Sequence, residues 1–272
     1  MSRIAAVTEK ARQEGNKLLI PYLVAGDPGL LETVKLMHAL VANGADVIEL
    51  GIPFSDPASD GPIIQRGVER SLARGTTLVD SLEVVREFRR IDQATPIVLM
   101  GYLNPIEIMG YEIFIQNATK AGVDGVLVVD MPPAESTELH GQLQAAGIDT
   151  IYLVSPTTNA DRAAFIAEYS SGYLYYISLK GVTGAALTDY ESVRNNIEAL
   201  RKLPDLPIVI GFGIKDGTSA RAMAELSDGV VIGSALVAKI AKLAASEGIS
   251  EEQISFTIAI IKEARKEINK IV

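Results

Sequence analysis

Three carboxylates follow one another closely at the end of an apolar run. Glu49 lies on a predicted strand, and Asp56 and Asp60 come after it in a proline-rich loop. Alternation along residues 46–54 places Glu49 on the same face as Val47, in a run that otherwise reads as buried. Burial without a basic partner raises the pKa of a carboxyl group. A Glu that is partly protonated near neutral pH can both give and take a proton, so the pattern predicts acid and base chemistry at Glu49.

The two loop acids allow more than one interpretation. Asp60, followed by Gly61 and Pro62, fits the start of a helix as well as it fits a catalytic acid. Asp56 is explained better by a solvated loop residue, or by one that contacts a partner, than by chemistry. Two acids four residues apart lack the ligand density of a calcium loop, and we predict no metal site.

Composition excludes several other classes of site. The chain has 272 residues and a formal net charge of −9, which argues against a nucleic-acid-binding face. Without Cys it can form no disulfide, thiolate zinc site or Cys nucleophile. His38 and His140 both lie in helical patterns, which leaves no Ser-His pair. The N-terminus does not resemble a signal peptide and no apolar run approaches a membrane span, so we expect a soluble cytoplasmic protein.

Eight β-branched runs, each followed by a helical pattern, must position the acidic residues. The predicted strands cover residues 18–24, 46–54, 96–102, 124–130, 150–154, 173–178, 207–212 and 229–233. The predicted helices cover residues 2–14, 30–42, 77–90, 112–121, 134–146, 161–169, 190–202, 219–226, 234–246 and 251–270. Alternation of this kind implies a parallel sheet with right-handed crossovers. Eight units in this length favour an α/β fold of the closed (β/α)8 type, a TIM barrel with extra N-terminal and C-terminal helices, as one domain over residues 1–272.

The unusual residues of the chain gather where these strands end, which is where a (β/α)8 barrel has its active site. Tyr102 and Asn104 follow the third predicted strand, and Pro132 follows the fourth. Loops rich in small residues follow the last three strands, at residues 181–186, 211–213 and 233–234. Backbone N–H groups in such loops often bind phosphate in this fold, and we predict a phosphate site there. The competing explanation is that the glycines only make tight turns.

Lys180 offers a different chemistry. It comes directly after the sixth predicted strand, where a lysine that forms a Schiff base could reach a substrate. A solvated loop lysine explains the position better, because a reactive lysine usually lies on the strand in an apolar setting. A Schiff-base aldolase therefore stays an alternative, and borohydride trapping with substrate would detect it.

Four segments together resemble those of a known family, the alpha subunit of tryptophan synthase. They are residues 49–62, Tyr-Leu-Asn-Pro at 102–105, Gly-Val-Thr-Gly-Ala at 181–185 and Gly-Phe-Gly-Ile at 211–214, and the resemblance runs in order over essentially the whole chain. It implies a lyase that cleaves indole-3-glycerol phosphate to indole and glyceraldehyde 3-phosphate in tryptophan biosynthesis, without a cofactor in this chain. It also implies an alpha2beta2 heterotetramer with a beta subunit that carries pyridoxal phosphate and receives the indole.

The resemblance also implies a role for individual residues. Glu49 and Asp60 would be the catalytic pair, with Asp60 opposite the ring N–H. The residues around the substrate would be Tyr22, Met100, Leu127, Tyr175, Thr183 and Phe212. The residues around its phosphate would be Gly184, Gly213, Gly233 and Ser234. The partner-facing residues would be Asp56, Asn104 and Pro132.

The chain departs from the better-known members at three places. These members often carry Arg directly after the serine matched by Ser178, where this chain has Leu179, polar residues where it has Ala186 and Leu187, and Phe where it has Tyr22. Two further alternatives to a channelling subunit stay open. One is a stand-alone lyase that releases free indole, and the other is a barrel retained only as an activating partner.

Overall fold

Among the described residues, parallel strands form one sheet that closes into a ring. The computed structural model describes residues 2–177, 190–203, 206–211, 213–243 and 248–271. The strands are β1 (Leu18–Val24), β2 (Ile48–Gly51), β3 (Ile97–Gly101), β4 (Gly125–Val128), β5 (Asp149–Thr150), β6 (Tyr152–Val154), β7 (Leu174–Tyr176), β8 (Ile208–Ile210) and β9 (Gly229–Ile232). They pair in the order β5-β4-β3-β2-β1-β9-β8-β7-β6, and every pairing is parallel.

The ring closes through Ile151. This residue alone separates β5 and β6, which stand at the two ends of the strand order. Its N–H still donates to the carbonyl of Val126 on β4 at 3.0 Å. The predicted strand at residues 150–154 is therefore present in two short pieces, one paired with each side of the ring. The fold is the predicted (β/α)8 TIM barrel; that residues 1–272 act as one domain stays a prediction.

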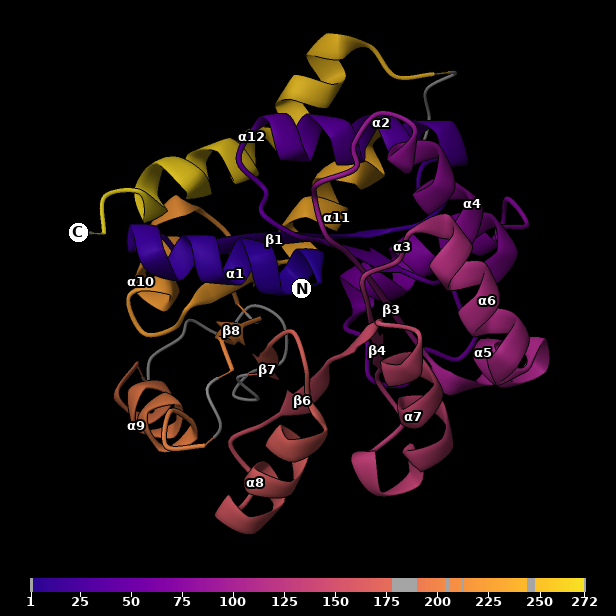
Figure 1. Ribbon diagram of the computed structural model, residues 1–272. Coiled ribbons are helices and arrows are strands. Elements are labelled where there is room, and N and C mark those ends of the chain that lie inside the picture. Colours follow the sequence, from indigo (N-terminus) through magenta and orange to yellow (C-terminus); the bar gives the residue numbers. More distant parts are fainter. Residues whose placement is uncertain (1, 178–189, 204–205, 212, 244–247, 272) are drawn as a thin grey trace.

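Helices cover the outside of the ring (Figure 1). They are α1 (Arg3–Glu14), α2 (Leu30–Ala42), α3 (Pro62–Leu72), α4 (Leu78–Arg89), α5 (Leu103–Met109), α6 (Tyr111–Ala121), α7 (Thr137–Ala145), α8 (Ala160–Tyr169), α9 (Tyr190–Leu200), α10 (Gly217–Ala224), α11 (Ser234–Ile240) and α12 (Glu251–Ile268), with 3-10 turns η1 (Pro133–Glu135) and η2 (Ala241–Leu243). None of those described combines the length and apolar character needed to cross a membrane.

Helices α3 and α5 are additions to the predicted set. Both lie in segments that follow the C-terminal ends of strands, at the end of the barrel that we call its mouth. Helix α3 begins as the alternative for Asp60 indicated, with Gly61 as N-cap and Pro62 in the first turn. Helix α5 carries Pro105 in its first turn, where a proline costs no intrahelical hydrogen bond. The predicted helix at residues 134–146 is divided into η1 and α7.

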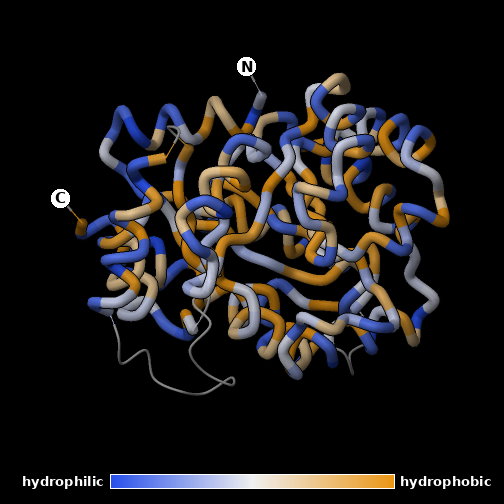
Figure 2. Tube along the Cα trace, turned by 90° about the horizontal axis from the view of Figure 1, so that it is seen from below, coloured by the Kyte–Doolittle hydropathy of each residue, from blue (hydrophilic) through white to orange (hydrophobic). Residues whose placement is uncertain are grey.

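Alternation along the strands divides the apolar side chains into two cores. Val47, Val98 and Val209 belong to the core inside the barrel. Ile48 and Leu99, one residue away in sequence, belong to the larger core between the strands and the helices. In Figure 2 the hydrophobic segments accordingly concentrate in the middle of the molecule. Side chains on the same face of the strand as Val47 therefore point into the barrel. Glu49, two residues further along, is one of them.

Three aspartates, Asp46, Asp124 and Asp228, bind the starts of strands at the end opposite the mouth; we call them the basal aspartates. Their carboxylates accept backbone N–H groups at 2.8–2.9 Å. The three donors lie at strand starts and are Leu19, Ile97 and Ile208. Each basal aspartate thus satisfies a donor on the strand next to its own.

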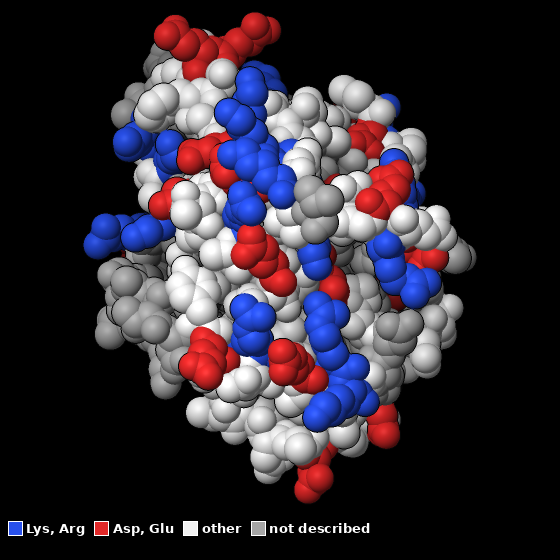
Figure 3. Space-filling model, turned by 90° about the vertical axis from the view of Figure 1, so that its left-hand side faces the viewer, with Lys and Arg blue, Asp and Glu red and all other residues white. Residues whose placement is uncertain are grey.

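Each basal aspartate also pairs with an arginine from a helix or its end. Asp46 pairs with Arg265 on α12, and Asp228 pairs with Arg201 at 2.9 Å. Asp124 and Arg89 are 2.6 Å apart, and both side chains are nearly inaccessible to solvent. Elsewhere the charges interleave, as Figure 3 shows for the side of the molecule on which α10 and α12 lie.

Candidate functional site

Glu49 is wholly buried inside the barrel, as its parity predicted. The Tyr173 hydroxyl donates to its Oε1 atom at 2.7 Å, while Oε2 is buried without a hydrogen-bond partner among the described residues. Burial raises the pKa of Glu49 to about 8, and the hydrogen bond from Tyr173 lowers it only in part. The side chain is therefore mostly protonated at neutral pH and can act as an acid.

Tyr173 lies directly before β7, on the inner face of the barrel with Tyr175. The sequence analysis gave it no role. Its only signal was that it shares parity with Tyr175, and its contact with Glu49 joins residues 124 positions apart.

Asp60 lies at the mouth, directly before the N-cap of α3. Burial raises its pKa to about 6, and a hydrogen bond from Tyr102 opposes that rise. The Tyr102 hydroxyl also accepts the Ser59 N–H at 3.1 Å, so one side chain holds both residues of the loop. The environments of Glu49 and Asp60 thus separate their pKa values, which is typical of carboxyls with different roles in one reaction.

Two tyrosine rings near these carboxyls pack directly against glycine residues. A Cβ atom added to Gly51 would lie 2.3 Å from the Tyr22 hydroxyl oxygen, and one added to Gly211 would lie 2.1 Å from that of Tyr175. Only glycine leaves room for the two rings at these positions. Burial raises the pKa of both tyrosines well above its usual value, and the charges of Glu49 and Asp60 raise it further.

The other predicted substrate-binding residues are described in part. Met100 and Leu127 lie on the inner face of the barrel with Tyr22 and Tyr175. Their side chains supply an apolar surface of the kind that an aromatic ring needs. Predictions at Thr183, Gly184, Phe212 and Lys180 lie outside the described residues.

Of the small residues predicted to bind phosphate, Gly213, Gly233 and Ser234 are described, and they follow the adjacent strands β8 and β9. Gly213 follows β8 in the left-handed region, at φ 69°, where glycine is favoured. Gly233 is the N-cap of α11 and Ser234 its first residue. A Cβ atom on Gly233 would stand 3.6 Å from that of Tyr22. Gly233 is therefore a neighbour of the Tyr22 side chain.

The predicted partner residues come from loops after three consecutive strands of the ring. Asp56 is exposed in the loop after β2, Asn104 is exposed on α5 after β3, and Pro132 precedes η1 after β4. The Leu103 N–H donates to Asp130 at 2.8 Å, which joins the second and third of these loops. The three residues share the mouth with Glu49 and Asp60.

Comparison with known proteins places the chain in a family. The family model described as tryptophan synthase alpha chain matches residues 8–266. The chain belongs to this family. A tryptophan synthase alpha chain of Burkholderia pseudomallei (strain K96243) is 53% identical over 256 residues, which are 94% of each protein. That of Laribacter hongkongensis (strain HLHK9) is 56% identical over 240 residues, 88% of this chain and 91% of the relative. The crystal structure of tryptophan synthase subunit alpha from Legionella pneumophila str. Paris, 42% identical, superposes over the whole of both chains with a TM-score of 0.91.

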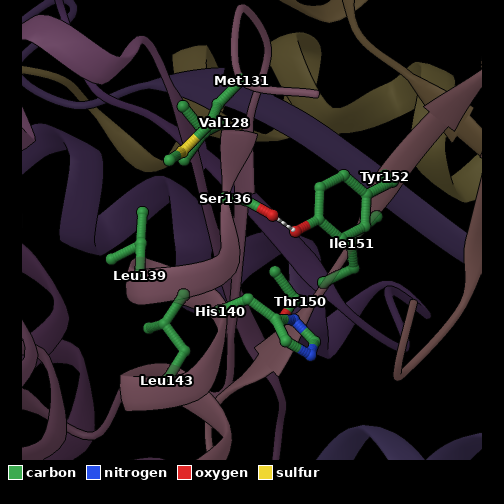
Figure 4. A pocket seen from close by; sticks show the side chains of 9 residues that line it. All are labelled: Val128, Met131, Ser136, Leu139, His140, Leu143, Thr150, Ile151 and Tyr152. Carbon is green, nitrogen blue, oxygen red and sulfur yellow. Dashed lines mark hydrogen bonds between the residues drawn. The ribbon is translucent and has the colours of Figure 1, made fainter. Parts of the chain in front are cut away.

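Two further hollows occur in this member of the tryptophan synthase alpha chain family. An open groove of about 360 Å³ lies between the loop after β2 and α3. It is lined by Phe54, Ser55, Asp56, Pro57, Ala58, Gln65, Val68, Glu69 and Leu72. The other is a small cavity of about 10 Å³ between α7 and the barrel wall, which is room for about one water. Figure 4 shows Ser136 and Tyr152 at its edge, joined by a 2.6 Å hydrogen bond between their hydroxyls.

Proposed function

We propose that this chain is the lyase subunit of a tryptophan synthase and cleaves indole-3-glycerol phosphate with Glu49 and Asp60. The observation that supports this most is the pair of carboxyls at one barrel mouth, one enclosed with a pKa of about 8 and the other with a pKa of about 6. A retro-aldol cleavage needs an acid for the ring carbon, a base for the glycerol hydroxyl and an anion near the ring N–H. Family membership supplies the substrate, and the two carboxyls supply these three functions.

The pKa order suggests the sequence of proton transfers. Protonated Glu49 first gives its proton to the ring carbon that bears the glycerol chain, and positive charge spreads to the ring nitrogen beside ionised Asp60. The Glu49 carboxylate then takes the proton of the glycerol hydroxyl. The hydroxyl carbon becomes an aldehyde carbon as the carbon–carbon bond breaks, and its electron pair restores the aromatic ring. Indole and glyceraldehyde 3-phosphate leave, and Glu49 ends protonated as it began.

The remaining assignments complete this proposal. Tyr22, Met100, Leu127, Tyr175, Thr183 and Phe212 surround the substrate, while Gly184, Gly213, Gly233 and Ser234 bind its phosphate. The reaction needs no cofactor from this chain. The chain acts in the cytoplasm in an alpha2beta2 complex, whose beta subunit carries pyridoxal phosphate and takes the indole.

We expect the lyase rate to show a bell-shaped dependence on pH. Asp60 must be ionised, so kcat/KM falls as pH drops through about 6. Glu49 must be protonated at the start, so kcat/KM falls as pH rises through about 8. Indole release measured between pH 5 and 9, at two solvent viscosities to identify diffusion control, tests this. A rate that keeps rising above pH 8.5 would show that Glu49 must start as the base.

The partner face gives a second expectation. We expect Asp56→Ala to keep most of the basal lyase rate, because the Asp56 side chain is exposed and accepts its hydrogen bond from the neighbouring Ser55 hydroxyl. We expect the variant to lose most of the stimulation by a beta subunit. Lid and loop closure often limits turnover, and a partner on Asp56 would hold the loop that leads to Asp60. The measurement is the lyase rate with and without saturating beta subunit.

Glu168→Ala, an exposed acid on α8, is the matched control and should be stimulated like the wild type. Equal stimulation of Asp56→Ala would reject coupling through this loop. No stimulation of the wild type would favour the stand-alone lyase, and no lyase activity under any condition would favour the non-catalytic partner.

A further inference from the structure

Both backbone polar groups of Asp60 form hydrogen bonds with nearby residues. Its N–H donates to the carbonyl of Pro57 at 3.0 Å, within the loop after β2. Its carbonyl accepts a hydrogen bond from the side-chain amide of Gln65, whose Nε2 atom lies 2.8 Å away. The two bonds act on either side of the Asp60 Cα atom. Together they restrict the two backbone dihedrals that set the direction of its carboxyl group.

The Gln65 side chain serves the loop before α3 and not the helix itself. Gln65 is the fourth residue of α3, and its own N–H donates to the carbonyl of the N-cap, Gly61, at 3.0 Å. The start of a helix has N–H groups to satisfy, not carbonyls. Asp60 lies before the N-cap, so its carbonyl stands outside the helical ladder. The side-chain bond from Gln65 is therefore an additional connection, from the helix back to Asp60.

Helix α3 is a firm support for this connection. Arg70, on the same helix, donates to both carboxylate oxygens of Asp27 at 2.9 and 2.7 Å. Asp27 is wholly buried after the end of β1. Gly67 lets α3 approach α11 closely, because a Cβ atom there would lie only 2.8 Å from Cγ1 of Val237. The helix is thus fixed both to the end of β1 and to α11.

The residue before Asp60 is held from another side of the mouth. The Ser59 N–H donates to the hydroxyl of Tyr102 at 3.1 Å. Tyr102 is the N-cap of α5, directly after β3. The loop is therefore held just before Asp60 from β3 and just after its Cα atom from α3. Of these two connections, the one from Gln65 binds Asp60 itself.

We propose that Gln65 is a positioning residue for the reaction, which fixes the Asp60 backbone so that its carboxylate stays opposite the ring N–H while positive charge develops there. Gln65 acts through the backbone carbonyl of Asp60 and transfers no proton. A misplacement of about 1 Å can cost roughly 10²-fold in rate, so a single hydrogen bond that sets this position affects turnover. This inference rests on the proposed function and adds one residue to it.

The first test is Gln65→Met, which keeps the length of the side chain and removes its N–H donor. We expect kcat to fall about tenfold, the scale of one lost hydrogen bond. KM should stay within about threefold of the wild type, because the residues proposed to bind phosphate and the indole ring are intact. Gln65→Lys keeps a donor and should retain kcat within about threefold. The open groove beside Gln65 has room for the longer side chain.

A double-mutant cycle with Asp60→Asn distinguishes positioning from a general structural effect. If Gln65 acts through the Asp60 carboxylate, its loss has no further effect once that carboxylate is gone. Gln65→Met should therefore change the residual kcat of Asp60→Asn by less than about twofold. Single-turnover measurements at high enzyme concentration make this residual rate accessible.

Gln116→Met is the matched control. Gln116 is exposed on α6, its Nε2 atom lies 3.2 Å from Glu112, and its loss should leave kcat unchanged. Thermal unfolding of every variant is measured alongside. With an active wild type, this inference alone is overturned by unchanged kcat in Gln65→Met, by a tenfold loss that persists in Asp60→Asn, by a folded Gln65→Lys without rescue, or by a Gln65→Met that is unfolded at the assay temperature. A wild type without lyase activity would overturn the proposed function and this inference together.

Discussion

Replacing Glu49 with Gln is expected to remove nearly all cleavage of indole-3-glycerol phosphate. The amide has the size of the carboxyl and can still accept the Tyr173 hydrogen bond, but it can neither give nor take a proton. Proton transfer by a positioned side chain contributes roughly 10²–10⁴-fold to a rate. Glu49 serves two transfers in the proposed sequence, so the loss should lie at the upper end. Retention of more than about a tenth of wild-type turnover would exclude a role of this size.

The same variant should keep its fold and its affinity for substrate. Its stability relative to the wild type should also change with pH. The folded-state pKa of Glu49 is about 8, raised from 4.5, so its favourable contribution is complete below about pH 4.5 and is lost as pH rises to about 8. The free energy of unfolding of Glu49→Gln should therefore rise relative to that of the wild type across this window, by roughly 3–5 kcal/mol at its upper end. Denaturant unfolding of both proteins at pH 5 and pH 8.5 measures this difference in the free energy of unfolding. Glu168→Gln is the control, whose difference from the wild type should not change with pH.

Gly233→Asp is expected to abolish productive binding of the phosphorylated substrate. The new carboxylate would stand at the start of α11, beside Tyr22, where the phosphate is proposed to bind. Repulsion between the new carboxylate and the phosphate group in a partly buried site should weaken binding by at least about tenfold. The affinity for inorganic phosphate, measured by calorimetry, should fall together with kcat/KM.

Gly233→Ala separates charge from shape. The φ of Gly233 is −107°, which any residue can adopt, and the nearest atoms to an added Cβ are 3.6 Å away, in ordinary contact. This variant should bind phosphate nearly as the wild type does. If Gly233→Asp remains folded and binds inorganic phosphate with unchanged affinity, the proposed phosphate site is wrong.

Local sequence patterns were enough to predict the alternating strands and helices of the barrel and the burial of Glu49. Helix α2 has the bounds that its pattern predicted, and period-two alternation placed Glu49 inside the barrel. The strand ends were less accurate, because residues such as Asp46 and Phe54 share the composition of the β2 run without pairing in the ladder. Helix α5 was missed because Asn104 and Pro105 are also typical of turns.

Contacts between distant segments could not be predicted. Tyr173 and Glu49 meet only because β7 and β2 face each other across the ring, and parity alone does not identify a partner. The same holds for Tyr102, whose hydroxyl reaches Ser59 from the following βα unit. Asp60 was undecided from its spacing, and the resemblance to the family, not the local pattern, favoured a catalytic role. That role stays a prediction.

The basal aspartates separate the parts of this chain that can diverge from those that cannot. Asp46, Asp124 and Asp228 fix the strand starts through backbone N–H groups and arginines, none of which reaches the mouth. Directed evolution of substrate range can therefore vary the loops after β2, β3 and β4 without rebuilding the scaffold. Randomising Asp124 in the same library would leave the buried Arg89 guanidinium without its carboxylate and cost stability before selection for a new substrate could begin. Mutational tolerance in this barrel is thus set by which end of a strand a residue occupies.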